Sequence, residues 1–167
     1  AEALNDLLTL LPHGDVHGEA LGVAMEDDVS GILTLAFSLL HVEDGYLEGS
    51  FDIRCPICAN EGNLLQPIKE KMGEKGFVLT NKTMKPPHYV DGNSVFVQTL
   101  LKAYEDYTGR EGRCESMGGG TYVHNLKNGV AFGASMPGTD NRMHGADEFA
   151  VVEELVTAAK IFAQVIA

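Results

Sequence analysis

The chain has 167 residues, of which 44% are apolar, so it can bury one or two small hydrophobic cores. Its 24 acidic and 12 basic residues give a net charge of −12, and a surface of that sign repels phosphate backbones, which argues against nucleic acid as a partner. The sequence has no apolar run near the ~20 residues that cross a membrane, no signal-peptide pattern and only three cysteines, so we expect a cytoplasmic protein with no membrane contact and no disulfide scaffold.

The first half of the chain predicts strands between two helical segments. Leu47, Phe51 and Ile53 alternate with other residues, which is typical of a strand with one buried face. Pro67 fits only the first turn or so of a helix, which sets that helix's start near Gly62. In chain order we expect the end of a helix before Pro12, a strand over residues 32–42, a hairpin turn at Asp44-Gly45, a strand over 46–53, a helix over about 62–73 and a strand over 77–83.

The Pro86-Pro87 pair is the best candidate for a domain boundary, because the residue before a proline is pushed toward extended backbone. Beyond it we expect a helix between Asn93/Ser94 and Gly109, short strands over residues 113–117 and 129–134, and a closing helix over about 152–166. The helical spacing of the apolar residues in the closing helix predicts a buried face made of Leu155, Ala159, Phe162 and Ile166.

These elements predict an α/β fold in two parts. Residues 1–86 give the order strand–strand–helix–strand of an incomplete ferredoxin-like unit, and the first helix reads as one that begins upstream. Residues 87–167 give helix–strand–strand–helix, a piece of a larger mixed sheet with flanking helices. Because both parts lack neighbouring elements, we expect exposed apolar edges that promote self-association.

Two loops carry the residue types of a binding site. Three consecutive glycines end at Gly120 and are followed by Thr121 and Tyr122, so backbone can approach a ligand closely there. His144 lies in a loop rich in Gly, Asn and Asp, just before the closing helix. Each signal is weak alone, since a triple glycine also forms a plain flexible turn and a loop histidine is commonly hydrogen-bonded without further function.

A competing signal comes from Cys55-Pro56-Ile57-Cys58. Two thiols at this spacing, after a strand and shortly before a helix, suit a thiol–disulfide site. The same pair could supply half of a zinc knuckle, but Cys114 is the only other cysteine. Besides a binding site at the two loops, two alternatives therefore stay open. The chain could be a thiol–disulfide protein that uses Cys55 and Cys58, or a non-catalytic interaction domain.

Five segments of the chain occur in a recognisable order, namely FDIRCP at residues 51–56, PHYV at 87–90, GGGTY at 118–122, NGVAFG at 128–133 and MHGADEF at 143–149. In order and spacing they resemble the PepV-like dipeptidases, zinc-dependent exo-dipeptidases of the M20 metallopeptidase family. The similarity covers nearly the whole chain, and five ordered motifs are far more specific than any one of them. The resemblance implies the C-terminal part of such an enzyme, with the end of a lid domain at residues 1–86 and the last section of the catalytic domain at 87–167.

The resemblance implies one metal ligand in this chain. His144 matches the family's last ligand to one of two zinc ions, and imidazole suits zinc. Asp147 or Glu148 would orient the second ring nitrogen of His144. The remaining ligands, the general base and a lid histidine come from the N-terminal half in the family. We therefore expect no catalytic residue in this chain, no activity by the chain alone, and the missing N-terminal half as its partner.

The resemblance also implies substrate contacts. Arg54 matches the arginine that grips the free C-terminal carboxylate of a dipeptide, a role that suits the planar fork of a guanidinium. On sequence alone Arg54 could equally be a surface arginine paired with Asp52 or Glu48.

The backbone of Gly119 and Gly120 and the hydroxyl of Thr121 would contact the main chain of the dipeptide. Val123 and His124 depart from the family's small residue and arginine at these positions, so the shape of the pocket and the preferred side chain of the substrate are left open.

Overall fold

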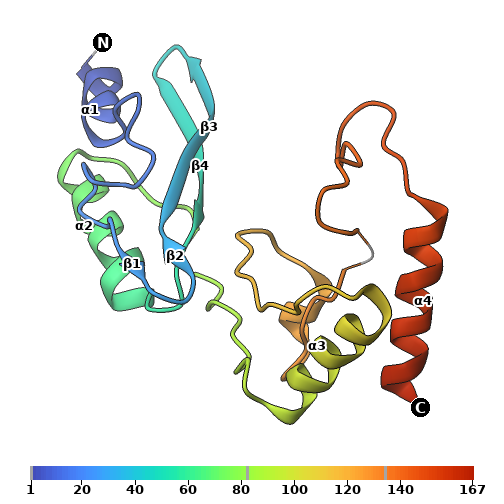
Figure 1. The fold of residues 1–167 in the computed structure, drawn as a ribbon. Coiled ribbons are helices and arrows are strands. Elements are labelled where there is room, and N and C mark those ends of the chain that lie inside the picture. The colour runs from blue at the N-terminus through green and yellow to red at the C-terminus, as the bar shows by residue number, and fades with distance from the viewer. Residues whose placement is uncertain (1, 82, 134) are drawn as a thin grey trace. The chain divides into compact units, whose positions relative to one another are not determined.

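The computed structural model describes residues 2–81, 83–133 and 135–167. Across these residues the chain is mixed α/β, with four α-helices and two small antiparallel sheets, which confirms the predicted fold class (Figure 1). It divides into two compact units. The first contains the described residues up to His88 together with Ser116–Gly119, and the second contains Tyr89–Glu115 and the described residues from Gly120 onward. No helix in the described parts of the chain is long and apolar enough to cross a membrane.

A long antiparallel hairpin dominates the first unit. Strand β3 (Thr34–Glu43) pairs with β4 (Tyr46–Arg54) across the predicted Asp44-Gly45 turn, with Thr34 opposite Arg54 and Glu43 opposite Tyr46. Gly45 has a φ of 78°, a left-handed value that suits glycine in this turn. The smaller sheet pairs β1 (Glu26–Asp27) with β2 (Gly31–Ile32). The predicted hairpin is therefore confirmed.

One leucine-rich core holds the first unit together. Helix α1 (Glu2–Leu10), the π-helical turn η1 (Glu61–Leu65) and helix α2 (Gln66–Glu74) contribute apolar side chains to the same cluster as β3. Leu21 and Leu33 are fully buried, and the predicted strand face of Leu47, Phe51 and Ile53 packs against the cluster partly buried. The buried members are Leu7, Leu10, Leu11, Leu21, Val23, Leu33, Leu35, Ala59, Leu64, Ile68 and Met72.

Two aspartates fold the loops that surround this core. The carboxylate of Asp15 accepts hydrogen bonds from the backbone N–H groups of the residues from His17 to Ala20, at 2.8–3.2 Å. The carboxylate of Asp27 accepts from the N–H groups of Val29, Ser30 and Cys58, so it ties the β1–β2 turn to the segment after β4. Since a carboxylate that accepts several N–H groups favours its charged form, the two loops depend on ionised aspartate.

The second unit is built on two helices that pack together. Ser94 caps α3 (Val95–Thr108) by accepting from the N–H of Val97, and Gly109 ends it with a φ of 67°. Helix α4 (Val152–Ile166) packs on α3, and a short 3-10 turn, η2 (Tyr122–Asn125), lies between them in sequence. Both predicted helices are confirmed. Their buried residues are Val97, Leu100 and Ala103 of α3 and Ala158 and Ile161 of α4.

Three predicted strands are wrong. The described residues of 77–83, 113–117 and 129–134 are irregular, with residues 82 and 134 outside the described part. A segment becomes a strand only when a neighbouring backbone pairs with it, and no described segment pairs with these three. The first unit accordingly shows the strand–strand–helix portion of the predicted ferredoxin-like order.

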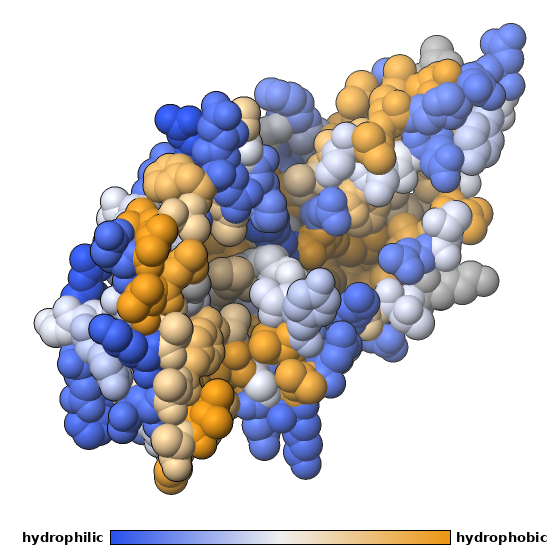
Figure 2. Space-filling view, turned by 90° about the vertical axis from the view of Figure 1, so that its right-hand side faces the viewer, coloured by the Kyte–Doolittle hydropathy of each residue, from blue (hydrophilic) through white to orange (hydrophobic). Residues whose placement is uncertain are grey.

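The predicted buried face of α4 is also wrong. Leu155, Phe162 and Ile166 are 45%, 41% and 83% exposed, and Ala159 is exposed as well. The reason is that α3 packs on α4 and the stripe of Ala158 and Ile161 is buried there, while the predicted stripe is covered only in part, as by the edge-to-face contact of Phe132 with Phe162, whose ring centroids lie 5.5 Å apart. Figure 2, which looks at the side where α4 lies in Figure 1, shows hydrophobic residues gathered on this surface.

The free energy of unfolding, measured as a function of pH, tests the hydrogen bonds that the Asp27 carboxylate accepts. The pKa of Asp27 is lowered from 3.8 to about 2, chiefly by the hydrogen bond from the backbone N–H of Ser30. Partial desolvation opposes this shift, while the Ser30 hydroxyl and the other N–H groups add to it. A lowered folded-state pKa stabilises the protein above the unfolded pKa, and this contribution is lost as the pH falls from about 4 to about 2. We expect Asp27→Asn to lower the free energy of unfolding at pH 7 and to reduce its fall between pH 4 and pH 2. Urea unfolding between pH 7 and pH 2 measures both effects.

Asp28→Asn is the matched control for Asp27→Asn, because no hydrogen bond or ion pair of Asp28 occurs among the described residues. It should leave the free energy of unfolding at pH 7 and its fall at acidic pH as they are in the unmodified chain. An equal effect of both substitutions would mean that general charge, rather than the bonds to Asp27, sets the acid sensitivity.

Candidate functional site

Arg54 is an exposed cation without a protein partner in the described chain. It is the last residue of β4, and its guanidinium forms no ion pair or hydrogen bond with any described residue, so the alternative pairing with Asp52 or Glu48 is not found. The chain's other arginines differ from it. Arg110 donates to the carbonyl of Pro137, Arg113 pairs with Glu111, and Arg142 lies 3.9 Å from Asp147.

The start of the glycine run lies against Arg54 in the first unit. A Cβ atom added to Gly118 would come within 2.7 Å of Cδ of Arg54, so the two residues touch. The Ser116 hydroxyl donates to the carbonyl of Ser30 at 3.2 Å, which attaches the segment to the β1–β2 turn. Gly119 belongs to the same unit. The structure thus brings together Arg54 and part of the glycine motif, which lie far apart in the sequence.

Gly120 and Thr121 belong to the second unit, at the start of η2. The Thr121 hydroxyl accepts from the N–H of Val123 at 3.3 Å, and the Thr121 N–H lies 3.0 Å from Nδ1 of His124. His124, one of the two departures from the family pattern, therefore helps to cap this turn. Because Thr121 Oγ1 acts as an acceptor in the cap, its hydroxyl hydrogen is left for another acceptor.

His144 lies in a loop with unusual backbone. Arg142, His144 and Asp147 have φ values of 56°, 62° and 58°, a left-handed conformation that non-glycine residues adopt at a cost of roughly 1–2 kcal/mol each. The loop is closed at its base, where the N–H of Phe149 donates to the carbonyl of Asn141 at 3.2 Å. Such a cluster of strained residues is typical of functional loops.

The two carboxylates expected to orient the His144 ring have other contacts. The carboxylate of Glu148 accepts from the backbone N–H of His144 at 3.3 Å, and Asp147 lies near Arg142. Glu148 therefore braces the backbone of the loop, and the imidazole of His144 makes no hydrogen bond within the described chain.

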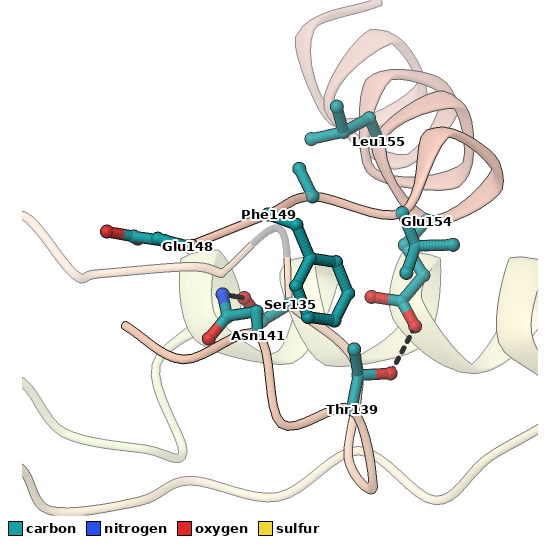
Figure 3. Close-up of a pocket in the computed structure, with 9 residues that line it drawn as sticks. Ser135, Thr139, Asn141, Glu148, Phe149, Glu154 and Leu155 are labelled. Atoms are coloured by element: carbon teal, nitrogen blue, oxygen red, sulfur yellow. Dashed lines mark hydrogen bonds between the residues drawn. The ribbon is translucent and has the colours of Figure 1, made fainter. Parts of the chain in front are cut away.

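A cavity of about 220 Å³ lies beside the base of this loop (Figure 3). Glu154, in the first turn of α4, accepts hydrogen bonds from the Thr139 hydroxyl at 2.5 Å and from the N–H of Met136 at 3.3 Å. The Glu154 carboxylate therefore fixes residues 136–139 to α4. Sequence reasoning did not identify this anchor, although an acidic residue in the first turn of a helix was a usable signal. The lining residues are Ser135, Thr139, Asn141, Glu148, Phe149, Ala150, Val151, Glu154 and Leu155.

The surroundings of the cysteine pair raise the pKa of both thiols. Burial raises the pKa of the Cys55 thiol, and partial desolvation and the nearby charge of Asp27 raise that of Cys58. Reactive thiols need a lowered pKa, because the thiolate is the nucleophile. Both cysteines are free thiols, and the backbone N–H of Cys58 donates a hydrogen bond to the Asp27 carboxylate at 3.2 Å. These features argue against the thiol–disulfide alternative.

The described part of the chain holds no complete metal site. No three side chains of His, Cys, Asp or Glu gather there in a way that could hold an ion. A zinc ion needs four ligands in a typical structural site and three from the protein in a catalytic one. The described residues therefore do not fit a zinc site by themselves, and His144 can contribute one ligand at most.

Comparison with known proteins gives the family of the chain. Residues 19–167 match the protein family described as "Peptidase family M20/M25/M40". The chain is 36% identical over 154 residues to "Putative dipeptidase YtjP" of Bacillus subtilis, which covers 92% of this chain and 33% of that protein. It is 34% identical over 161 residues to "Beta-Ala-Xaa dipeptidase" of Lactobacillus delbrueckii subsp. lactis, which covers 95% of this chain and 34% of that protein.

The chain therefore spans about a third of the length of the curated relatives it matches. The family match extends over nearly all of the chain and includes the segments of both Arg54 and His144. The resemblance inferred from the five motifs is confirmed, and the chain belongs to the M20/M25/M40 family of peptidases.

Proposed function

We propose that this chain is the C-terminal part of a dipeptidase that hydrolyses dipeptides with a free C-terminal carboxylate. The observation that carries the proposal is the guanidinium of Arg54, which has no partner among the described residues of a chain whose net charge is −12. The names of the relatives support the substrate class, since both describe dipeptidases. In this proposal residues 1–86 belong to a lid domain and residues 87–167 to the catalytic domain of a cytoplasmic enzyme.

Arg54 is the proposed carboxylate-binding residue. A guanidinium presents parallel N–H groups that a carboxylate accepts with two oxygens, and such charge-assisted bonds are shorter and stronger than neutral ones. Because the guanidinium has no partner among the described residues, substrate binding breaks no internal ion pair. The contact would favour free dipeptides over peptides whose C-terminus is blocked or extended.

The glycine motif is the proposed contact for the substrate main chain. Backbone N–H groups of Gly119 and Gly120 and the hydroxyl of Thr121 would bind there. The cap of η2 supports this assignment for Thr121, because it uses the oxygen as an acceptor and leaves the hydrogen to donate to a substrate carbonyl.

His144 is the proposed metal ligand of the chain. A bound zinc ion would supply Lewis acidity and a water of lowered pKa. The strained loop and its bond to Glu148 would hold the His144 imidazole in place, while the remaining ligands and the general base come from the rest of the enzyme. The chain alone is then inactive.

The rest of the enzyme is also the proposed partner of the exposed stripe on α4. This stripe consists of Val152, Leu155, Val156, Phe162 and Ile166, each 41–83% exposed. At helical spacing these residues form a continuous apolar face, which in a folded enzyme needs a covering element.

Substitution of Arg54 tests the substrate assignment in the full-length enzyme. We expect Arg54→Ala to lower kcat/KM for a free dipeptide about 10- to 100-fold, since hydrogen bonds to charged groups contribute ~1.5–3 kcal/mol. Hydrolysis of the corresponding C-terminal amide should change little, because the amide has no carboxylate to bind. Arg113→Ala, which removes an exposed partner of Glu111, should leave both rates unchanged. Equal losses on dipeptide and amide would contradict a carboxylate-binding role.

Metal content tests the role of His144. The purified 167-residue chain should bind little zinc and hydrolyse no dipeptide, because its described residues offer no three-ligand cluster. In the full-length enzyme His144→Ala should lower bound zinc and abolish activity, while Cys58→Ser should preserve both. Tight zinc at one per chain that is lost on Cys58→Ser and kept on His144→Ala would overturn the assignment.

Sedimentation of the isolated chain tests the exposed face of α4. We expect concentration-dependent self-association, and the pair Leu155→Lys and Phe162→Lys should weaken it by placing charge within the apolar stripe. Leu39→Lys is the control on the hairpin, since Leu39 of β3 is 70% exposed. If the chain associates through α4, this substitution should leave the association unchanged. A compact monomer for the unmodified chain at all concentrations would show that the stripe needs no partner.

A further inference from the structure

The position of Gly118 is constrained by space and not by backbone conformation. Its φ lies outside the left-handed range that favours glycine, so alanine could adopt the same backbone. A Cβ atom at Gly118 would nevertheless meet Arg54 at three atoms, with Cδ at 2.7 Å and Cβ and a guanidinium nitrogen (Nη1) at 3.4 Å. Real Cβ atoms essentially never approach another heavy atom within 3.0 Å, so any larger residue here displaces Arg54.

The other two glycines of the run lack this constraint. A Cβ at Gly119 would meet only Met117, at an ordinary 3.7 Å, and a Cβ at Gly120 would meet nothing within 4 Å. Of the three glycines, only Gly118 lies in contact with the Arg54 side chain. Its contacts there run from Cβ to the guanidinium, which is the full length of the side chain.

Two observations make this contact consequential for Arg54. First, the guanidinium forms no hydrogen bond or ion pair within the described chain, so the contact with Gly118 limits a side chain that otherwise has large rotamer freedom. Second, the segment that carries Gly118 is itself attached, because the Ser116 hydroxyl donates to the carbonyl of Ser30. Gly118 thus belongs to a segment that is hydrogen-bonded to the rest of the first unit, and Arg54 lies against it.

We propose that Gly118 is a positioning residue for Arg54, whose missing side chain leaves the space that directs the guanidinium toward the carboxylate of the substrate. The proposal rests on the carboxylate-binding role of Arg54 and adds to it a residue from a distant part of the sequence. In this arrangement Gly118 acts through Arg54 and needs no contact of its own with the dipeptide.

The test is a double-mutant cycle in the full-length enzyme, with a free dipeptide and its C-terminal amide as substrates. Gly118→Ala should lower kcat/KM for the free dipeptide about 10-fold, mainly through a higher KM, and leave the amide unaffected. In the Arg54→Ala background Gly118→Ala should cost nothing further, because the atoms with which its Cβ collides most closely are absent. Gly73→Ala is the matched control, since a Cβ at Gly73 in α2 meets nothing within 4 Å.

The outcomes separate the two proposals. If Arg54→Ala does not reduce the preference for dipeptide over amide, the substrate assignment fails. If Arg54→Ala reduces that preference but Gly118→Ala has no effect, or its effect persists in the Arg54→Ala background, the positioning role fails and the assignment of Arg54 stands. As an independent readout in the 167-residue chain, Gly118→Ala should shift the Arg54 Nε–Hε resonance, whereas Gly73→Ala should not. An unshifted resonance would also overturn the positioning role.

Discussion

The antiparallel pairing of β3 with β4 is the constraint on which the first unit depends. Its register places Thr34 opposite Arg54, and the alternation of side chains turns one face of the hairpin toward the leucine core. A shift by one residue would turn every side chain of a strand to the opposite face, so burial of the apolar face strongly specifies the register. The packing of core residues therefore fixes the place of Arg54 at the end of β4, although Arg54 forms no ion pair with any described residue.

The excess of negative charge bears on the proposed role of Arg54. A net charge of −12 repels anions in general, so the proposed binding of a substrate carboxylate would need a local positive group, and no acid among the described residues neutralises Arg54. Part of the acidic excess is used inside the fold, where Asp15 and Asp27 accept backbone N–H groups and shape the loops around the core. Glu154 has a comparable role in the second unit, where it holds residues 136–139 to α4.

Both proposed binding elements depend on backbone rather than on large side chains. The loop around His144 stores strain in three left-handed non-glycine residues and is held by the Asn141–Phe149 bond and by Glu148. Gly118 has no left-handed backbone, and its proposed role is the space that it leaves beside Arg54. Strain and empty space are two ways to hold a functional side chain in one orientation, and each is destroyed by a small change in residue size or conformation.

Local interactions explain what the sequence by itself determined. The Asp44-Gly45 turn and the ends of α3, expected at Asn93/Ser94 and at Gly109, depend on residues close together in the chain, and the structure confirms them. The order of the five motifs indicated the M20 family, which the family match confirms. The strands expected over residues 77–83, 113–117 and 129–134 and the buried face of α4 were wrong, because pairing and burial need a partner from elsewhere. Only the tertiary structure decided that Arg54 lies against Gly118 and pairs with no acid in the described parts of the chain, since this contact joins residues whose separation in sequence leaves no periodic or local signal.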